Sequence, residues 1–255
     1  MTTSDIKLYE PINTLKTVNE NIWIVDGSIA HMRAYGTTIP FPTRMTVIKL
    51  KNDDLFLHSP IQLTLGLKAE IDALGTVRHL ISPNKLHYEF IPEWSKHYPA
   101  ALRWASPGVQ QRAEQMKISV VFDRDLGETP DPAWADEIDQ TIVHGSRFLH
   151  EVVFFHKSSR TLILADLIEN FEHEKIGRFL GLLAKLGGAL DPDGKAPLDI
   201  QMTFWGQKNQ ARQAVRQMLA WNPEKIILAH GRWYRQNGMQ ELRRAFRWLD
   251  PIGTN

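Results

Sequence analysis

Three short apolar runs in the sequence each lead into a side chain that can bind a metal ion. One run ends at His230, another ends at Asp166, and a third, residues 77–82, precedes a loop that carries His87. Short apolar runs with polar boundaries are typical of buried strands, and ligands collect where strands end in layered α/β folds. Neutral imidazole and carboxylate are ligands that zinc and iron accept. The sequence therefore predicts one divalent metal ion, zinc or iron, bound by His87, Asp166 and His230.

Each of these three side chains also has a purely structural interpretation. Asp166 could be the N-cap of a helix that begins at residues 167–169. His87 could be a packed loop histidine, and His230 could simply cap its strand. The metal-binding interpretation is favoured for His230 because Asp166 and His87 occupy equivalent strand ends.

The composition excludes several classes of protein. The 255 residues are 43% hydrophobic and 23% charged, with a net charge of +1 and no cysteine. Nothing in this balance indicates nucleic-acid binding, no apolar stretch approaches membrane-spanning length, and disulfides and thiolate ligands are excluded. The N-terminus has no features of a signal peptide. We expect a cytoplasmic protein with a single domain over residues 1–255 and a small-molecule substrate, with neither nucleic acid nor a membrane as partner. The oligomeric state stays open.

The order of predicted elements suggests two similar halves, each beginning with antiparallel strands and continuing with strands and helices in alternation. A helix is predicted at residues 171–186, where two glycines end it. The segments with the composition of strands are residues 21–26, 45–50, 54–58, 77–82, 101–104, 118–122, 137–143, 150–156, 161–165 and 225–230. Two β-sheets packed face to face, each covered by helices, would satisfy this order.

Three motifs connect these elements to a known superfamily. They are S-P-N-K-L-H at residues 82–87, E-V-V-F-F-H-K-S-S-R-T-L-I-L-A-D-L at residues 151–167, and L-A-H-G at residues 228–231. By its element order, the stretch of residues 21–231 resembles the metallo-β-lactamase superfamily of metal-dependent hydrolases and oxidoreductases. Within it, the three motifs make the chain most similar to an uncharacterised branch, a family of unknown function with an eroded metal motif. The resemblance implies an α+β fold, an αββα sandwich of two mixed β-sheets flanked by helices.

The resemblance also implies roles for the residues at the strand ends. The superfamily's bridging aspartate matches Asp166, and its final histidine matches His230. Its H-x-H-x-D-H motif falls on the loop in which His87 is the remaining histidine and Asn84 is a candidate oxygen ligand. The resemblance therefore implies a reduced, mononuclear metal site at the edge of the sandwich.

Further positions depart from the superfamily pattern and remain candidate ligands or pocket residues. The superfamily's histidine in a G-H-T loop corresponds by spacing to Arg147, with His144 and His150 close by. Arg147 could instead bind a substrate carboxylate or phosphate. The acidic strand end after the first hairpin corresponds to His58. Glu151, at the start of a strand, could bind metal, act as a base, or be an exposed strand residue.

Three functions agree with this ligand set. The first is a metal-dependent hydrolase in which His87 and Asp166 are catalytic as well as ligands, and the ion activates water and polarises the substrate. The second is a metal-free descendant that binds a ligand or a protein. The third is a non-haem iron oxidoreductase with two histidines and one carboxylate. The retained Asp166 and His230 favour the first or the third, and the reduced first motif favours the second.

A long segment without clear periodicity, residues 28–44, separates two predicted strands. Loops of this length in compact domains are usually functional or disordered. We expect this segment to form a lid over the site, with Arg33 or Arg44 meeting the substrate and Trp205 and Trp233 as apolar walls. The alternative is a dimer contact or a surface loop packed elsewhere.

Overall fold

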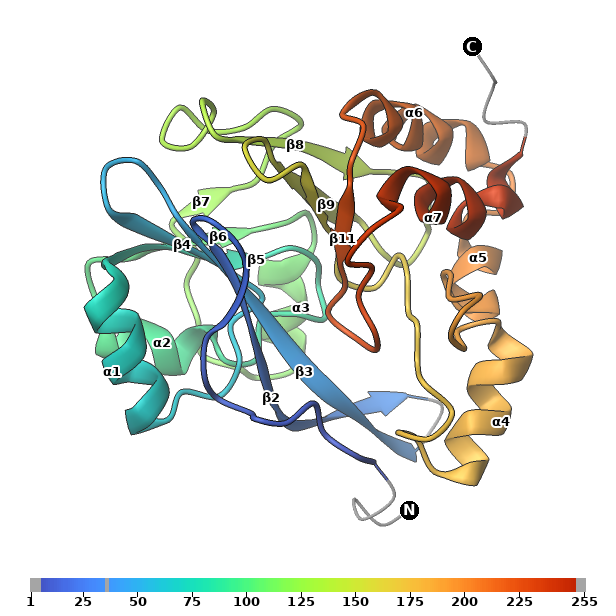
Figure 1. The fold of residues 1–255 in the computed structure, drawn as a ribbon, viewed down its shortest axis with the longest axis horizontal. Coiled ribbons are helices and arrows are strands. Elements are labelled where there is room, and N and C mark those ends of the chain that lie inside the picture. Colours follow the sequence, from blue (N-terminus) through green and yellow to red (C-terminus); the bar gives the residue numbers. More distant parts are fainter. Residues whose placement is uncertain (1–5, 35–36, 251–255) are drawn as a thin grey trace.

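The computed structural model describes residues 6–34 and 37–250, and it consists of two packed β-sheets with helices on their outer sides (Figure 1). In the first sheet the strands follow one another in chain order. They are β1 (Lys16–Asn19), β2 (Ile22–Ala34), β3 (Thr37–Lys49), β4 (Asp54–His58), β5 (Thr76–Ser82), β6 (Leu102–Ala105) and β7 (Arg124–Asp125). Strands β1 to β4 pair antiparallel, and β4 to β7 pair parallel, so the sheet is mixed.

The second sheet has the order β11-β10-β9-β8. Its strands are β8 (Ile138–Val143), β9 (Glu151–His156), β10 (Thr161–Ile163) and β11 (Lys225–Ile227). Neighbours β8, β9 and β10 pair antiparallel, whereas β10 and β11 pair parallel. This sheet is therefore mixed as well.

The helices cover the outer faces of the sheets. They are α1 (Leu65–Leu74), α2 (Ile91–His97), α3 (Val109–Gln115), α4 (Arg178–Gly187), α5 (Leu198–Thr203), α6 (Lys208–Ala220) and α7 (Gly238–Ala245), followed by the short 3₁₀ helix η2 (Arg247–Leu249). Buried side chains of α1, α2 and α3 pack on the first sheet, and those of α6 and α7 pack on the second. No helix in the described part of the chain is both long and apolar enough to cross a membrane.

Apolar side chains from the facing sides of the two sheets form the central core. Phe56 of β4 meets Phe154 of β9 edge to face, with ring centroids 5.2 Å apart, and Trp134 contacts Phe56 in the same way. Ile163 and Ile227 bring β10 and β11 into this core. Apolar burial between the sheets is thus the main force that holds them face to face. The predicted αββα sandwich is confirmed.

Parallel pairing explains why the candidate residues meet at one edge. Strands β10 and β11 run in the same direction, so Asp166 and His230 follow neighbouring strand ends. Strands β4 and β5 are also parallel, which places Ser59 and the loop carrying His87 beside each other. Because the carboxyl ends of parallel neighbours lie at the same edge of a sheet, residues far apart in the sequence gather there.

The expected loop at residues 28–44 is wrong, because most of this segment belongs to the long antiparallel strands β2 and β3. Pro40 and Pro42 suggest a loop in the sequence, yet β3 has β4 as a neighbour only over Thr46–Lys49. Around the prolines one edge of β3 therefore lacks a described strand partner, and prolines are tolerated at such edge positions. Residues 35 and 36, at the end of this hairpin, lie outside the described residues.

Two other predicted elements also differ from the structure. Residues 118–122 are not a strand, and the first sheet instead ends with β7. The helix predicted from Phe171 begins only at Arg178. Phe171 and its neighbour Asn170 form isolated β-bridges with Leu190 and Gly231, and this pairing holds the chain extended.

Candidate metal centre

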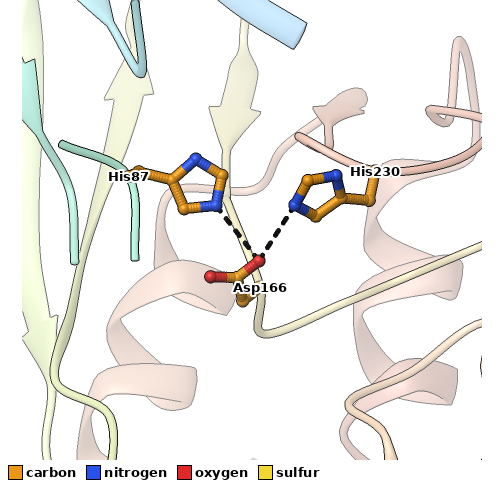
Figure 2. Close-up of side chains that lie close together, drawn as sticks. All are labelled: His87, Asp166 and His230. Atoms are coloured by element: carbon orange, nitrogen blue, oxygen red, sulfur yellow. Dashed lines mark hydrogen bonds and ion pairs between the residues drawn. The ribbon is translucent and has the colours of Figure 1, made fainter. Parts of the chain in front are cut away.

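The structure brings His87, Asp166 and His230 together. Their potential ligand atoms all lie within 4.8 Å of one another. Figure 2 shows the two imidazoles turned toward one carboxylate oxygen: Asp166 Oδ1 lies 3.1 Å from His87 Nε2 and 3.3 Å from His230 Nε2. No helix follows Asp166, since residues 167–169 are a bend leading into a β-bridge, so the N-cap interpretation of this residue is wrong.

The other ring nitrogen of His230 fixes where its proton lies. Nδ1 is 2.9 Å from the carbonyl oxygen of Pro42 in β3. A carbonyl only accepts, so Nδ1 must donate. In a neutral His230 the Nε2 lone pair then points at the carboxylate oxygen of Asp166, and two acceptors face each other. Either a proton on Nε2 or a bound cation between the two groups makes this contact favourable.

His87 is also oriented through its second nitrogen. Its Nδ1 lies 2.6 Å from the hydroxyl of Ser59, the residue that follows β4. A serine hydroxyl can donate or accept, so both tautomers of His87 are compatible with this contact. As with His230, Nε2 is left directed at Asp166. Partners of this kind on the outer nitrogen fix the orientation of metal-bound histidines in proteins.

The donor set, and the spacing between the carboxylate and each imidazole, fit a small divalent cation. With metal–ligand bonds of about 2.0–2.1 Å, two ligands of a tetrahedral zinc ion lie roughly 3.3 Å apart. The separations of 3.1 and 3.3 Å between Asp166 Oδ1 and the two Nε2 atoms agree with that value. Two imidazoles and one carboxylate leave further coordination positions for water or substrate.

A buried network lies behind the carboxylate. Asn84 Nδ2 donates to Asp166 Oδ2 at 2.8 Å and to Glu151 Oε2 at 2.9 Å. Glu151 is fully buried and accepts from the backbone N–H groups of Ala165 and Asp166, each at 2.8 Å. Asn84 Oδ1 accepts from the N–H of Leu86, which fixes the amide orientation. Glu151 and Asn84 therefore position Asp166 and its strand end.

The electrostatics of the carboxylates differ within this network. Burial, followed by the charge of Asp166, raises the pKa of Glu151 to about 7. Burial also acts to raise the pKa of Asp166, but the two imidazoles and their contacts outweigh it and hold this pKa below its usual range. Asp166 is therefore the carboxylate that stays ionised, as a metal ligand must.

His58 lies behind the site and not among the clustered ligands. Its side chain is buried and packs edge to face on Phe154, with ring centroids 5.6 Å apart. Its Nε2 has no hydrogen-bond partner in the described part of the chain. Burial first, and then the neighbouring His87, lowers the pKa of His58 to about 3. The residue is accordingly a neutral core histidine.

The connection that carries His144, Arg147 and His150, the candidates for the superfamily's G-H-T histidine, lies apart from the metal-site residues. His144 Nδ1 lies 3.2 Å from His150 Nδ1, and His144 Nε2 lies 2.5 Å from Glu128 Oε1. Arg147 is exposed in the same connection between β8 and β9. None of these side chains belongs to the group around Asp166.

The structure does not place Trp205 or Trp233 as walls of the metal centre. Trp205 is 74% exposed, which is not the environment of a pocket wall. Trp233 lines a separate cavity. Arg33 lies in β2, and its side chain is outside the described residues. Phe41 of β3 does reach the site, where its ring centroid is 5.4 Å from that of His230.

Sequence reasoning missed several contributors to the centre. Pro42 acts through its backbone carbonyl, which has no sequence signature. Ser59 follows a predicted strand end, and that position is a signal that could have identified it. Glu169 carries a carboxyl whose pKa burial raises to about 8, with His230 and Asp166 among the charges that influence it. Nothing in its sequence context distinguished it from an exposed glutamate.

The two-sheet architecture gives the chain a metallo-β-lactamase-like fold. A metallo-β-lactamase from Erythrobacter litoralis aligns with 96% of this chain and 99% of its own, at 12% identity and a TM-score of 0.63. The FIM-1 enzyme from Pseudomonas aeruginosa, solved in its mono-zinc form, aligns with 97% of this chain and 98% of its own, at 14% identity and a TM-score of 0.61. At such identities the likeness establishes the fold alone.

The family assignment comes from the sequence. The chain belongs to the family described as "Domain of unknown function (DUF4336)", whose profile matches residues 19–178. No curated protein matches the chain. The match to a family of unknown function agrees with the resemblance to an uncharacterised branch of the superfamily.

Proposed function

We propose that the protein is a metal-dependent hydrolase acting on a small molecule, with one divalent ion held by His87, Asp166 and His230. The observation that carries this proposal is the contact between His230 Nε2 and Asp166 Oδ1 at 3.3 Å, with Nδ1 committed to the carbonyl of Pro42. A neutral imidazole in that orientation needs a cation between itself and the carboxylate. The mono-zinc form of the FIM-1 enzyme, a protein of the same fold, is consistent with a single-ion site.

A bound divalent ion would lower the pKa of a water molecule and polarise an ester, lactone, amide or phosphoester oxygen. The chain's own residues prepare the site for this chemistry. Pro42 and Ser59 hold the two imidazoles with Nε2 directed inward. Asn84 holds the second oxygen of Asp166, so that Oδ1 alone faces the two rings. The ring of Phe41 beside His230 excludes water from one side.

The iron alternative rests on the same donor set. Two histidines and one carboxylate also form the ligand set of non-haem iron sites for oxygen chemistry. The choice of metal therefore decides between hydrolysis and redox chemistry. The metal-free alternative corresponds to a protonated His230 that forms an ion pair with Asp166.

Metal analysis of protein purified without chelator tests the proposal. We expect about one equivalent of zinc or iron per chain after incubation with zinc, iron and manganese in turn. The variants His230→Gln and Asp166→Asn should retain far less, because each removes one of three ligands. His97→Gln is the matched control, since His97 is an exposed histidine of α2.

The same samples separate the three functions. Turnover of an ester, lactone or phosphoester panel by the zinc form supports the hydrolase, whereas oxygen consumption by the iron form alone supports the oxidoreductase. Substoichiometric metal in the wild-type protein under all these conditions would overturn the metal site and leave the metal-free descendant. Equal metal contents in the wild type and in Asp166→Asn would overturn the ligand assignment.

A further inference from the structure

A cavity separate from the metal centre lies beside residues 232–235, which follow His230 in the chain. Its volume is about 590 Å³, within the roughly 300–1,000 Å³ typical of small-molecule sites. The N-terminal segment, β1, β2 and β3 form part of its wall, and the stretches around residues 172–175 and 232–235 complete it. None of the three clustered metal-site residues lines it.

The lining of this cavity is rich in positive charge. Its basic residues are Lys16, Arg44, Lys175, Arg232 and Arg235, and its acidic residues are Glu10, Asp26 and Glu172. Five positive and three negative side chains leave a net charge of +2. A concave surface with an excess of one charge attracts ligands of the opposite sign.

The acidic groups are already engaged within the protein. Asp26 Oδ1 lies 2.7 Å from Arg44 Nη2, and its Oδ2 lies 2.8 Å from Lys16 Nζ. Glu172 Oε2 accepts a hydrogen bond from the Tyr9 hydroxyl, with 2.5 Å between the two oxygens. Glu10 accepts the backbone N–H of Ile12. Asp26 is therefore paired with two cations, whereas Glu172 and Glu10 accept hydrogen bonds from neutral donors.

Two of the basic side chains lack a carboxylate partner among the residues that the structure describes. Lys175 Nζ contacts the carbonyl oxygen of Leu8 at 3.2 Å and lies 4.5 Å from the ring centroid of Tyr9. The guanidinium of Arg235 lies 5.0 Å from the ring centroid of Trp233. Both cations are therefore held over aromatic rings at the cavity wall, an arrangement that orders them without neutralising them.

Part of the remaining wall is apolar. Ile24, Pro11 and the Trp233 ring line the same cavity, and Trp233 also packs on the core between the sheets. We propose that this cavity binds a small organic anion, whose phosphate or carboxylate group pairs with Lys175 and Arg235 and whose apolar body contacts Ile24 and Trp233. None of the three metal-site residues lines this cavity, so the proposal does not rest on the proposed hydrolase activity.

Isothermal titration calorimetry with phenyl phosphate and benzoate tests this site, with phenol as the uncharged probe. The protein is stripped of metal with a chelator that is then dialysed away, and it keeps Asp166, whose carboxylate repels anions from the metal centre. We expect saturable, one-to-one binding of at least one of the two anions and none of phenol. Binding should weaken as the salt concentration rises, because ion pairing at an open cavity is screened.

Substitutions at the cavity locate the bound anion. Lys175→Gln and Arg235→Gln should each weaken binding at least tenfold, whereas Arg235→Lys, which keeps the charge, should recover most of the affinity. Arg243→Gln is the matched control, because Arg243 is an exposed arginine of α7 that does not line the cavity. No saturable binding of either anion at millimolar concentration would overturn the proposal. Equal affinities in Arg235→Gln and Arg243→Gln would do the same.

Discussion

Arg44 forms a buried ion pair with Asp26 in the first sheet and hydrogen bonds to the loop after β11, so its removal should be costly. Its side chain is 2% exposed and that of Asp26 is 4% exposed, with Arg44 Nη2 and Asp26 Oδ1 2.7 Å apart. Arg44 Nη1 also donates to the carbonyl oxygens of Leu228 at 2.7 Å and Gly231 at 2.8 Å. Arg44→Met would leave two carbonyls unpaired and Asp26 with only Lys16 as a cation. Removing one partner of a buried ion pair costs about 3–5 kcal/mol, and we expect a loss in that range.

A double-mutant cycle measured by urea denaturation checks this magnitude. The double variant Asp26→Asn/Arg44→Met should lose about 2 kcal/mol less unfolding free energy than the two single variants lose in sum. In the double variant neither member of the ion pair is left as a buried charge without its partner. Arg103 provides a matched control, because it forms a comparable two-pronged pair with Asp123 whose side chains are each 29% exposed. For Arg103→Met we expect a loss of no more than about 1 kcal/mol. Equal losses for the two arginine variants would refute the role assigned to burial.

The same arginine should influence the proposed metal site. Arg44→Lys keeps a positive charge near Asp26. A lysine ammonium, however, lacks the planar guanidinium that contacts Asp26 and the carbonyl oxygens of Leu228 and Gly231 at the same time. The loop around His230 would then lose a constraint, and we expect zinc affinity to fall by about tenfold, as for other changes outside the ligand set. Competition with a chromogenic chelator measures this affinity. An unchanged zinc affinity in Arg44→Lys would show that the loop is held by other contacts.

Two further predictions concern stability. Burial lowers the pKa of His156 and of His79 to about 4. As the pH falls below about 6.5, the unfolded chain is therefore protonated at these residues before the folded chain is, and each residue costs about 3 kcal/mol of stability by pH 4. The urea midpoint of His156→Gln should thus fall less steeply between about pH 7 and pH 4.5 than that of the wild type, and parallel slopes would contradict this. Gly231 has φ +84°, and a Cβ there would lie 2.2 Å from the carbonyl oxygen of Asn170. Gly231→Ala should thus lower the thermal midpoint by several degrees and reduce metal binding, whereas Gly66→Ala in α1, where no atom lies within 4 Å of the added Cβ, should preserve or raise the midpoint.

The clustering of three residues at one edge could be predicted from the sequence because each follows a short apolar run. Asp166 and His230 end runs that become the parallel neighbours β10 and β11, and parallel neighbours share an edge. His87 follows β5 in the other sheet, so its approach to Asp166 also required the packing of the two sheets. The resemblance to a sandwich fold supplied that packing, which periodicity alone does not specify.

Other features could not be predicted because they depend on contacts across the fold. Pro40 and Pro42 indicate a loop locally, but the pairing of β3 with β2 in a long hairpin overrides that indication. Glu151 looked like an exposed strand residue, whereas β9 lies between β8 and β10 and every residue in it is buried. A strand buried on both faces has no polar alternation, so its single carboxylate gives no sign of which way it points.

The network around Asp166 explains why the proposed site should hold one ion. Asn84 presents an N–H group to Asp166 Oδ2, and a nitrogen that donates cannot also bind a metal. Its own oxygen accepts from Leu86, so the amide cannot turn over without losing that bond. Glu151 uses Oε1 for the N–H of Ala165 and Oε2 for Asp166 and Asn84. A second ion would have to displace these buried hydrogen bonds, each of which costs about 1–3 kcal/mol to leave unmade. Asp166 Oδ1 and the two imidazoles therefore form the part of the centre that is free to bind a cation, and the metal content we expect is one equivalent and not two.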